Sequence, residues 1–340
     1  MATHIVMTTI QEPTDSVRKF VNVIREQETK CIVIGDKKGP HDYPLENTDL
    51  YTLGQQLQLP YAVASQLPTG HYSRKNIGYL IAISEGASSI YETDDDNEPL
   101  DVWRPRDEWV EAEKTTFKGW VNIYDAFCNE PLWPRGFPLS KVNSNDNKFT
   151  FSGETNRYQA PIQQGLADGS PDVDAIWRLT MDRDIRFKGD QSIYLAPGSW
   201  CPFNSQSTWW WPDAYMLLYL PSYCTFRMTD IWRSFVAQRC LWEMGYGVVF
   251  HGAEVYQERN PHDLMKDFEH EIPGYLHNAE ICEKLEALHL SSLPGKIGDN
   301  LYACYEMLVS EGLVGEQELV LLEAWIGDMR EAMKGLNNVG

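Results

Sequence analysis

The chain has 340 residues, of which 43% are hydrophobic and 23% are charged, as in ordinary globular proteins with a large core. Asp and Glu together number 49 and Lys and Arg 29, so the formal net charge is −20. A negative excess of this size argues against broad electrostatic binding to nucleic acids or anionic membranes. It is compatible with an enzyme that uses a metal cation.

The cysteine pattern and the beginning of the sequence bear on the cellular compartment. Seven cysteines are scattered along the chain, without the closely spaced pair that would suggest a zinc site. Reduced thiols in the cytoplasm are therefore expected. The segment Met1–Gln11 has no basic region followed by a long apolar run, and no apolar stretch approaches the roughly 18 residues of a membrane span. We expect neither a signal peptide nor a transmembrane segment.

The first elements predict a parallel sheet. Ile5–Thr9 is typical of a buried strand, Thr14–Gln27 carries apolar residues at helical spacing, and Cys31–Asp36 is typical of a second strand. This order predicts a βαβ unit, whose ligands bind at the carboxyl ends of the strands. Asp36 lies at such an end and is a candidate contact for a ribose or a base. The alternative is an aspartate that only closes the turn into Lys37–Pro40.

The next strong prediction is a helix over Ser73–Gly86, with Ser73 as its N-cap and Gly86 as its C-terminal stop. Arg74 and Lys75 fall in its first turn, where the helix dipole disfavours cations. Their position makes sense if an anion binds there, because the free amide groups of a helix N-terminus also favour anions. The alternative is that both side chains point into solvent.

A short apolar run, Ser88–Tyr91, leads into the consecutive carboxylates of Asp94, Asp95 and Asp96. Side chains alternate along a strand, so Asp94 and Asp96 are expected on one side, where two carboxylates can hold a hard cation such as Mg²⁺ or Mn²⁺. An acidic loop in solvent is the commoner fate of such a triplet in so acidic a chain. The helix and strand that precede the triplet favour the metal site.

The middle of the chain is less regular. Leu100–Lys148 is rich in Trp, Pro and charge and predicts a long loop over the sheet, a common place for functional residues. Ile162–Leu179 predicts a short helix, a turn and a strand. Within it, Asp172 and Asp174 are interpreted as turn and strand-entry caps in preference to a second acidic pair.

A polar loop, Phe203–Thr208, is a candidate for binding sugar hydroxyls. The rings of Trp209–Trp211 could stack on a sugar or base, although core packing is the commoner role of such rings. Cys224–Met228 predicts a strand, and Asp230–Gly245 a long helix. If the start of that helix faces a pocket, Asp230 is the candidate general base. Its alternative is a structural role at the positive end of the helix dipole.

The last part of the chain predicts helices only, from Tyr275 onward, which either dock on the sheet or associate with a second copy. His262 precedes them and, taken alone, is more often a capping or packed residue than a metal ligand. We therefore predict an α/β domain over residues 1–272, with a mixed, mainly parallel sheet flanked by helices, and a helical appendage over residues 273–340.

A set of longer motifs is also present. They are Ser73–Leu80, Tyr91–Pro99, Trp133–Pro138, Pro171–Ile176, Cys201–Gln206, Asp230–Arg233 and Arg259–His262. In content and order these motifs resemble the STELLO-type glycosyltransferase family, and the resemblance runs from about Ile5 to Phe268. A weaker resemblance links the aspartate triplet to the reversibly glycosylated polypeptides.

The family resemblance implies a GT-A fold, which is Rossmann-like, a nucleotide-sugar donor and a divalent cation at the aspartate triplet. By position, Asp94 and Asp96 would ligate the metal in this DXD-type motif, and Asp94 and Asp95 would contact the donor. Analogy with GT-A enzymes in general implies roles for the remaining candidates. These are Asp36 at the nucleoside, Arg74 and Lys75 at the donor, His262 as a further metal ligand, and Asp230 as the base.

The predicted function is the transfer of a hexosyl or pentosyl unit from a nucleoside diphosphate, foremost UDP, to a hydroxyl group. The acceptor is an unidentified glycan, protein or small molecule, and the cofactor is Mn²⁺ or Mg²⁺, which would stabilise the leaving diphosphate. Two other classes stay open. One is a metal-dependent nucleotide-sugar hydrolase that uses water as the acceptor. The other is a non-catalytic sugar-binding module with tryptophans as its platform.

Overall fold

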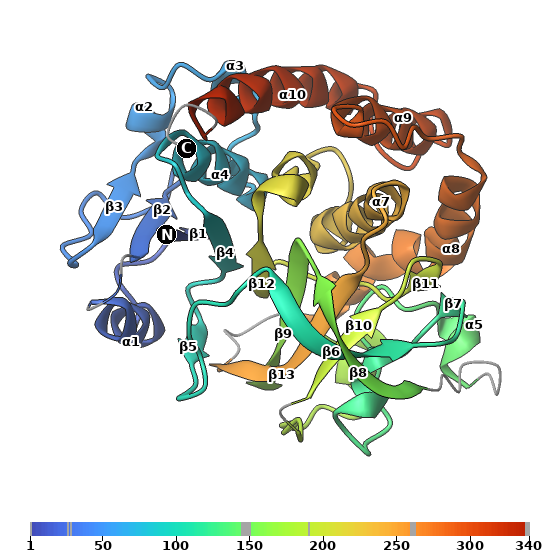
Figure 1. Cartoon of the computed structure of the whole chain (residues 1–340). Helices are drawn as coiled ribbons and strands as arrows, with labels where there is room; N and C mark the ends of the chain where they lie inside the picture. The colour runs from blue at the N-terminus through green and yellow to red at the C-terminus, as the bar shows by residue number, and fades with distance from the viewer. Residues whose placement is uncertain are drawn as a thin grey trace.

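The computed structural model describes residues 2–25, 27, 29–143, 151–189, 191–258 and 263–336. Its centre is one large mixed β-sheet with helices packed against it (Figure 1). This arrangement confirms the predicted α/β class with a mixed sheet flanked by helices. The candidate metal ligand His262 lies outside the described residues.

The N-terminal part of the sheet is parallel, in the order β3-β2-β1-β4. The parallel pairing brings the carboxyl ends of these strands to one edge of the sheet, as the βαβ pattern predicts. Helix α1 begins after Thr14, whose hydroxyl accepts a hydrogen bond from the Val17 amide, and its apolar face is buried. Helices α1 and α4 pack on opposite faces of these strands. The bounds are β1 Thr3–Thr8, α1 Asp15–Ile24, β2 Thr29–Ile34, β3 Thr48–Tyr51, α2 Leu53–Gln56, α3 Ala62–Gln66, α4 Lys75–Ser84 and β4 Ser89–Thr93.

Helix α4 starts later than predicted. A 3₁₀ turn over Tyr72–Arg74 precedes it, so Ser73 is not its N-cap. The Ser73 amide instead donates to His71 Nδ1, and its hydroxyl bonds to that of Ser222. The C-terminal end follows the prediction, because Gly86 adopts a φ of 86°, a conformation that glycine allows without steric cost.

Beyond β4 the sheet continues in the order β12-β9-β13-β10-β6-β8. The pairs β9·β13 and β10·β6 are parallel, whereas β12 is antiparallel to both of its neighbours, β4 and β9. Strand β5 joins β13 from the side, and β7 and β11 form a separate ribbon. The bounds are β5 Asn97–Pro99, β6 Trp109–Thr115, β7 Gly119–Trp120, α5 Leu139–Val142, β8 Phe151–Gln159, β9 Ile162–Gly169, α6 Ala175–Thr180, β10 Ser192–Leu195, β11 Ser199–Trp200, β12 Ser207–Trp210, α7 Thr229–Glu243 and β13 Val248–Gln257.

Three local predictions in this half were wrong. The segment Ile162–Leu179 is a strand followed by a helix, because β9 is a central strand buried along its whole length. Cys224–Met228 contains a 3₁₀ turn that leads into α7 instead of a strand. The region Leu100–Lys148, expected as a loop, contributes β6 to the main sheet. In each case pairing with distant strands or helices decided between local patterns that the sequence left similar.

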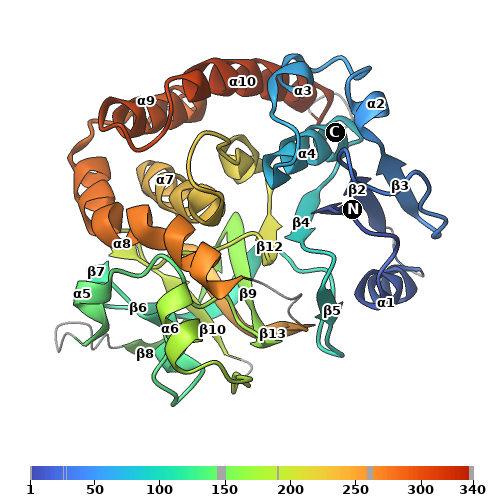
Figure 2. The ribbon, with the colours of Figure 1, turned by 180° about the vertical axis from the view of Figure 1, so that it is seen from behind.

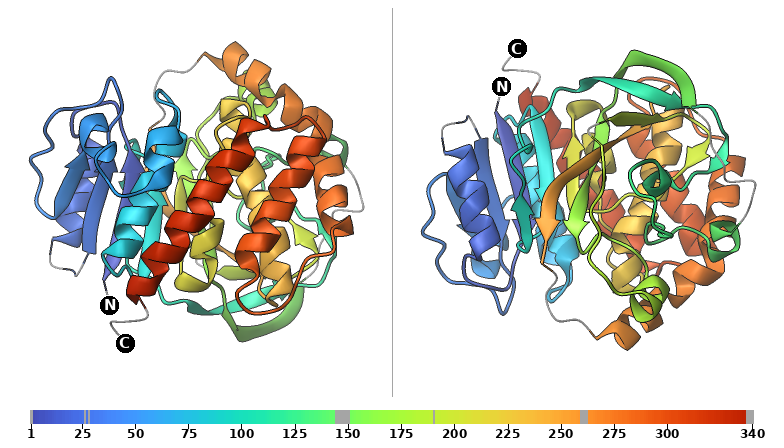
Figure 3. Two further views of the ribbon diagram at one scale, coloured as in Figure 1. Left: turned by 90° about the horizontal axis from the view of Figure 1, so that it is seen from above. Right: turned by 90° about the horizontal axis from the view of Figure 1, so that it is seen from below.

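The C-terminal helices α8, α9 and α10 follow one another in an arc around α7 and α4 (Figures 1 and 2). Their bounds are Leu264–Ala287, Ile297–Ser310 and Gln317–Leu336, so the predicted boundary at 272/273 falls inside α8. Leu285 and Trp325 belong to the same apolar cluster as Trp210 of the sheet. Asp328 of α10 accepts hydrogen bonds from amides at the start of α3, and seen from above α10 lies across α4 (Figure 3). The helices are thus docked on the sheet domain. Within the described ranges, no helix is both long and apolar enough to cross a membrane.

Candidate functional site

Two adjoining cavities open at the carboxyl ends of β1, β2 and β4. The aspartate cavity, about 290 Å³, is bounded by Asp94–Asp96, Arg135, Asn204–Gln206 and Asp230 among others. The β1–β2 cavity, about 750 Å³, is bounded by Gly35–Lys38 and Thr69–Tyr72 among others. Thr8, Tyr72, Asp95 and Phe226 line both. Most of the predicted site residues therefore lie around one continuous region.

The aspartate triplet follows directly from the end of β4. Lys75, fully buried at the start of α4, donates from Nζ to the Thr93 carbonyl at 3.0 Å and to Asp94 Oδ1 at 2.9 Å. The Thr9 hydroxyl donates to Asp95 Oδ2. Gln257 Nε2 donates to Asp96 Oδ2 at 3.2 Å. Residues from β4, α4, the end of β1 and β13 thus fix the triplet at the mouth of the sheet.

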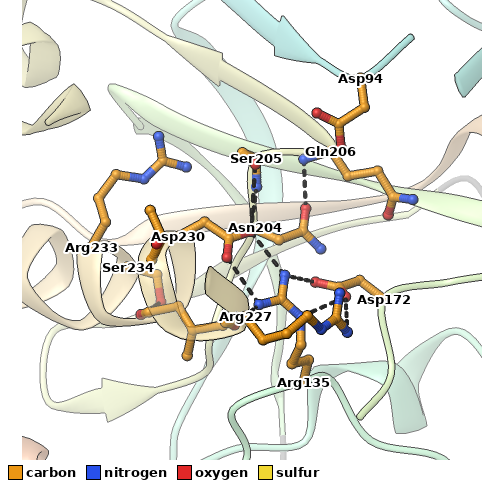
Figure 4. Close-up of polar contacts among 12 residues, drawn as sticks. Asp94, Arg135, Asp172, Asn204, Ser205, Gln206, Arg227, Asp230, Arg233 and Ser234 are labelled. Carbon is orange, nitrogen blue, oxygen red and sulfur yellow. Dashed lines mark hydrogen bonds and ion pairs between the residues drawn. The ribbon is translucent and has the colours of Figure 1, made fainter. Parts of the chain in front are cut away.

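Helix α7 anchors β4 as well, from the face of the sheet on which α4 also packs. Arg233 of α7 forms a two-pronged ion pair with Glu92, at 2.9 Å and 2.6 Å, and both side chains are buried. Asp230 lies one turn earlier on the same helix and points to the aspartate cavity (Figure 4). The same helix therefore positions the strand that carries the triplet and one wall of the cavity.

The carboxylates of the triplet lack sufficient positive charge around them. Burial raises the pKa of Asp94, Asp95 and Asp96, and the charge of Asp94 raises the last two further, that of Asp96 to about 7. The Lys75 ammonium offsets only part of this effect at Asp94. Such carboxylates are stabilised by a bound cation.

A divalent cation would fit this environment if both protein carboxylates and the phosphate oxygens of a bound molecule served as its ligands. In the part of the chain that the structure describes, no group of three His, Cys, Asp or Glu side chains forms a complete metal cage. Mg²⁺ in phosphate-handling sites takes one or two carboxylates and completes its shell with water and phosphate oxygens. The triplet offers that smaller ligand set.

Asp230 is neutralised by Arg135 (Figure 4). Arg135 donates to both oxygens of Asp230 at 2.9 Å, to both oxygens of Asp172 at 2.8 Å, and to the Arg227 carbonyl. Burial alone would raise the pKa of Asp230, but the charges of Arg135 and then Arg233 outweigh it and hold that pKa well below its ordinary value. A carboxylate in this state is a weak base. The geometry therefore favours a structural role for Asp230 over the predicted role of general base.

The two predicted donor-binding cations separate in the structure. Lys75 lies against the triplet, as described above. The Arg74 guanidinium is buried and donates to Gln56 Oε1 at 2.8 Å and to the carbonyls of Leu67 and Ala64 at 3.0 and 3.4 Å. Arg74 borders the β1–β2 cavity, but its bonds hold the loop that forms the cavity wall.

Asp36 also borders the β1–β2 cavity, at the end of β2. Its Oδ1 accepts from the Lys37 amide at 2.7 Å, and its Oδ2 accepts from the Gly70 amide at 2.6 Å. The next residue, His71, stacks on Tyr72, and Phe226 lies edge-on to both rings. An aromatic wall and a fixed carboxylate at the end of a parallel strand are suited to a nucleoside.

Several cavity residues were not among the predicted site residues. Arg135 occurs in a motif that carried the family resemblance, which was the available signal for it. Gly136 next to it has a φ of 91° and no space for a Cβ because of Ile231, so this turn requires glycine to bring Arg135 against α7. Asp174, treated as a strand-entry cap, caps helix α6 through the Trp177 amide. Asp172, the other member of that pair, is a partner of Arg135.

Comparison with known proteins agrees with the resemblance seen in the motifs. The profile described as STELLO glycosyltransferases matches residues 227–337. A curated protein of Arabidopsis thaliana, "Probable glycosyltransferase STELLO1", is 28% identical over 349 aligned residues, covering 96% of this chain and 44% of the relative. "Probable glycosyltransferase STELLO2" of the same species is 29% identical over 273 residues, covering 74% of this chain and 35% of the relative. The resemblance to this family is confirmed.

The chain spans less than half the length of these curated relatives. Among solved structures, one described as a mycobacterial protein aligns with a TM-score of 0.40 and 8% identity, over 82% of this chain and 75% of the other.

Proposed function

We propose that this chain, which is related in sequence to the STELLO glycosyltransferases, transfers a sugar from a nucleoside diphosphate to a hydroxyl group with a GT-A-type, metal-assisted site. The observation that carries the proposal is the half-buried aspartate triplet at the junction of two cavities. It stands at the carboxyl edge of a parallel sheet, where α/β proteins bind nucleotides. Uridine is the proposed nucleoside, on the family resemblance.

The two cavities suit the two parts of such a donor. The β1–β2 cavity, with Asp36 and the aromatic wall of His71, Tyr72 and Phe226, would hold the nucleoside. Asp95 and Thr8 line both cavities, so the diphosphate would lie beside them. The aspartate cavity would then take the sugar.

The residues present fit a divalent cation, Mn²⁺ or Mg²⁺. Asp94 and Asp96 would hold it, and when bound it would neutralise charge on the leaving diphosphate. Lys75 keeps Asp94 in place through its 2.9 Å ion pair and adds positive charge close to the same region. In the transfer, the bond between the anomeric carbon and the diphosphate oxygen breaks, and the diphosphate leaves with the electron pair of that bond. The acceptor oxygen bonds to the same carbon, and its proton passes to the departing diphosphate or to solvent.

Asp230 has a different part in this proposal from the one predicted. It holds Arg135 and accepts from the Ser205 amide at 3.2 Å, so it fixes two walls of the aspartate cavity at once. Removing it would misplace both walls, which is costly because transfer depends on close alignment of the reacting atoms.

The sugar-binding module loses its main argument in the structure. Trp209 and Trp210 are fully buried, and Trp211 is 6% exposed, so they pack in the core and offer no stacking surface. The hydrolase uses the same site and differs only in the acceptor. Release of free sugar at a rate that no added acceptor changes would identify it.

The first experiment is a thermal-shift screen of UDP, GDP and their sugar conjugates, each with Mn²⁺, Mg²⁺ or chelator. A ligand present at a hundredfold excess over its Kd stabilises the folded protein by about 2.7 kcal/mol. We expect a stabilisation by UDP conjugates that chelator abolishes. Asp94→Ala and Asp96→Ala should remove it while leaving the protein folded, whereas Asp101→Ala, at an exposed carboxylate outside both cavities, should not. Metal-dependent donor binding that persists in both triplet variants would contradict the assignment.

A further inference from the structure

The loop before β12 forms a wall of the aspartate cavity that the function proposed above does not yet use. Strand β12 pairs antiparallel with β4 in a register that sets Ser207 opposite Thr93. The preceding residue, Gln206, therefore lies next to Asp94, as Figure 4 shows. Asn204 and Gln206 both line the cavity, and each is only 7% exposed.

The backbone of this loop is firmly held. Gln164 Oε1 accepts from the Asn204 amide at 2.9 Å, and the Thr208 hydroxyl donates to the Asn204 carbonyl at 2.6 Å. Asn204 Oδ1 accepts from the Gln206 amide at 2.9 Å, and Asn97 Nδ2 donates to the Gln206 carbonyl at 3.0 Å. These bonds fix the backbone of the loop and the direction of the Asn204 side chain before any ligand arrives.

The remaining amide groups have no partner among the described residues. Asn204 Nδ2 and the whole side-chain amide of Gln206 make no hydrogen bond there, although both residues are more than nine-tenths buried. Buried polar side chains in native proteins are nearly always hydrogen-bonded, so groups that face a cavity without a partner are suited to a ligand. Here the cavity lies directly beside the triplet.

The charges around these amides favour a ligand without a negative group. All of the N–H donors of Arg135 are taken by Asp172, Asp230 and the Arg227 carbonyl. The other two arginines that line the cavity have partners of their own, because Arg227 pairs with Glu271 at 2.9 Å and Arg178 donates to the Pro171 carbonyl. A carboxylate in the cavity would thus find no free donor on Arg135, and would lie close to the charges of the triplet. Neutral hydroxyls, by contrast, both donate to and accept from side-chain amides.

We propose that Asn204 and Gln206 select the donor sugar, by hydrogen bonds to the hydroxyls of a neutral sugar. The inference rests on the function proposed above. The sugar is joined to the diphosphate, which would lie beside the triplet, and Gln206 is the neighbour of Asp94 on the adjacent strand. The amides therefore contact the transferred sugar and discriminate against a sugar that carries a carboxylate.

The test is calorimetric binding, in the presence of Mn²⁺, of UDP, UDP-glucose, UDP-galactose, UDP-xylose, UDP-glucuronic acid, GDP and GDP-mannose to the full chain. Gln206→Met removes the amide at nearly constant size. Asn204→Ser keeps a side-chain oxygen that can accept from the Gln206 amide and removes the Nδ2 donor without adding a charge. Gln159→Met, at a glutamine of β8 that lines neither cavity, is the matched control.

We expect at least one neutral conjugate to bind wild-type protein more tightly than UDP, and UDP-glucuronic acid to bind no more tightly than UDP. Each cavity variant should weaken the best neutral conjugate by about five- to tenfold, as expected for the loss of one or two hydrogen bonds. The Kd of UDP for each cavity variant should lie within about twofold of the wild-type value. The control variant should bind every ligand with a Kd within about twofold of the wild-type value. Gln206→Met should also melt close to the wild-type temperature, because the amide that it removes faces the cavity and makes no hydrogen bond to the described residues.

Other outcomes separate the inference from the function on which it rests. If UDP binds but no neutral sugar adds affinity, or if the variants bind the conjugates as wild type does, the role of these amides is wrong and the transferase proposal stands. Tight binding of UDP-glucuronic acid overturns the preference for a neutral sugar. Loss of UDP affinity in both folded variants would make the residues structural. If neither UDP nor GDP and its mannose conjugate bind, the transferase proposal and this inference fail together.

Discussion

Two groups of carboxylates line the same cavity and differ in how their charge is balanced. Burial raises the pKa values of Asp94, Asp95 and Asp96, and the charge of Asp94 raises those of Asp95 and Asp96 further. Asp172 and Asp230 share Arg135, which holds the pKa of Asp230 below its ordinary value despite burial. The first group has negative charge left for a cation, whereas the second is complete within the protein. Both groups consist of aspartates, so the difference between them is whether the protein itself balances their negative charge.

The largest expected effect comes from breaking the compensated group. Arg135→Ala leaves Asp172 and Asp230 buried without their partner, and removing one member of a buried ion pair costs about 3–5 kcal/mol. Urea denaturation should show a loss of that size in the free energy of unfolding. Arg183→Ala breaks an exposed pair with Glu130 and should cost less than about 1 kcal/mol. A loss below about 1 kcal/mol for Arg135→Ala would mean that the two carboxylates find other partners. Asp172 and Asp230 would then not depend on Arg135 to balance their charge.

A partly buried histidine at the β1–β2 cavity gives a second, smaller effect. Burial lowers the pKa of His71 to about 4 from 6.5, and the charge of Asp36 offsets only part of this. The unfolded chain thus binds more protons than the folded protein between pH 6.5 and 4, so stability falls as the pH is lowered through that window. Between pH 6.5 and about 5, wild-type protein should lose about 1–2 kcal/mol more than His71→Phe, which keeps an aromatic ring against Tyr72.

The matched control for this pH dependence is His289→Phe, at an exposed histidine near the end of α8. Its free energy of unfolding should follow the wild-type curve as the pH falls. If His71→Phe also follows that curve, His71 is charged in the folded protein. The β1–β2 cavity would then be lined by a His71 cation, whereas the structure indicates a neutral His71 ring.

The sequence alone allowed us to predict those features of the site that depend on residues adjacent in the chain. Three adjacent aspartates after a short strand, and a βαβ opening that sends strand ends to one edge, are local patterns. The parallel order of β1, β2 and β4 and the place of the triplet on a cavity wall follow from them. The basic pair Arg74–Lys75 was visible too, but the different roles of its two side chains were not. Arg74 donates to Gln56 and Lys75 donates to Thr93, and these partners lie 18 positions away in opposite directions.

The compensated group was beyond local patterns. Arg135 and Asp230 are 95 positions apart, and nothing near either residue signals the other. Asp230 therefore looked like an available base at a helix start. The order of β9 and α6 was missed for a similar reason, since a short apolar run fits a helix or a buried strand until its neighbours are known. A single sequence does not show which residues far apart in the chain will pair in the fold, although such pairs decide between local alternatives.

The smallest expected effect has the opposite sign and is specific to the triplet. Asp96→Asn removes one of the crowded charges and keeps an oxygen that can accept from Gln257 Nε2. Since the raised pKa of Asp96, about 7, reflects a cost of ionisation in the folded state, the metal-free variant at pH 8 should be more stable than wild type by about 1 kcal/mol. Mn²⁺ should then stabilise wild type more than the variant, which reverses or closes the difference. If Asp96→Asn destabilises the metal-free protein, the triplet is compensated as fully as Asp172 and Asp230, and both groups of carboxylates are scaffold.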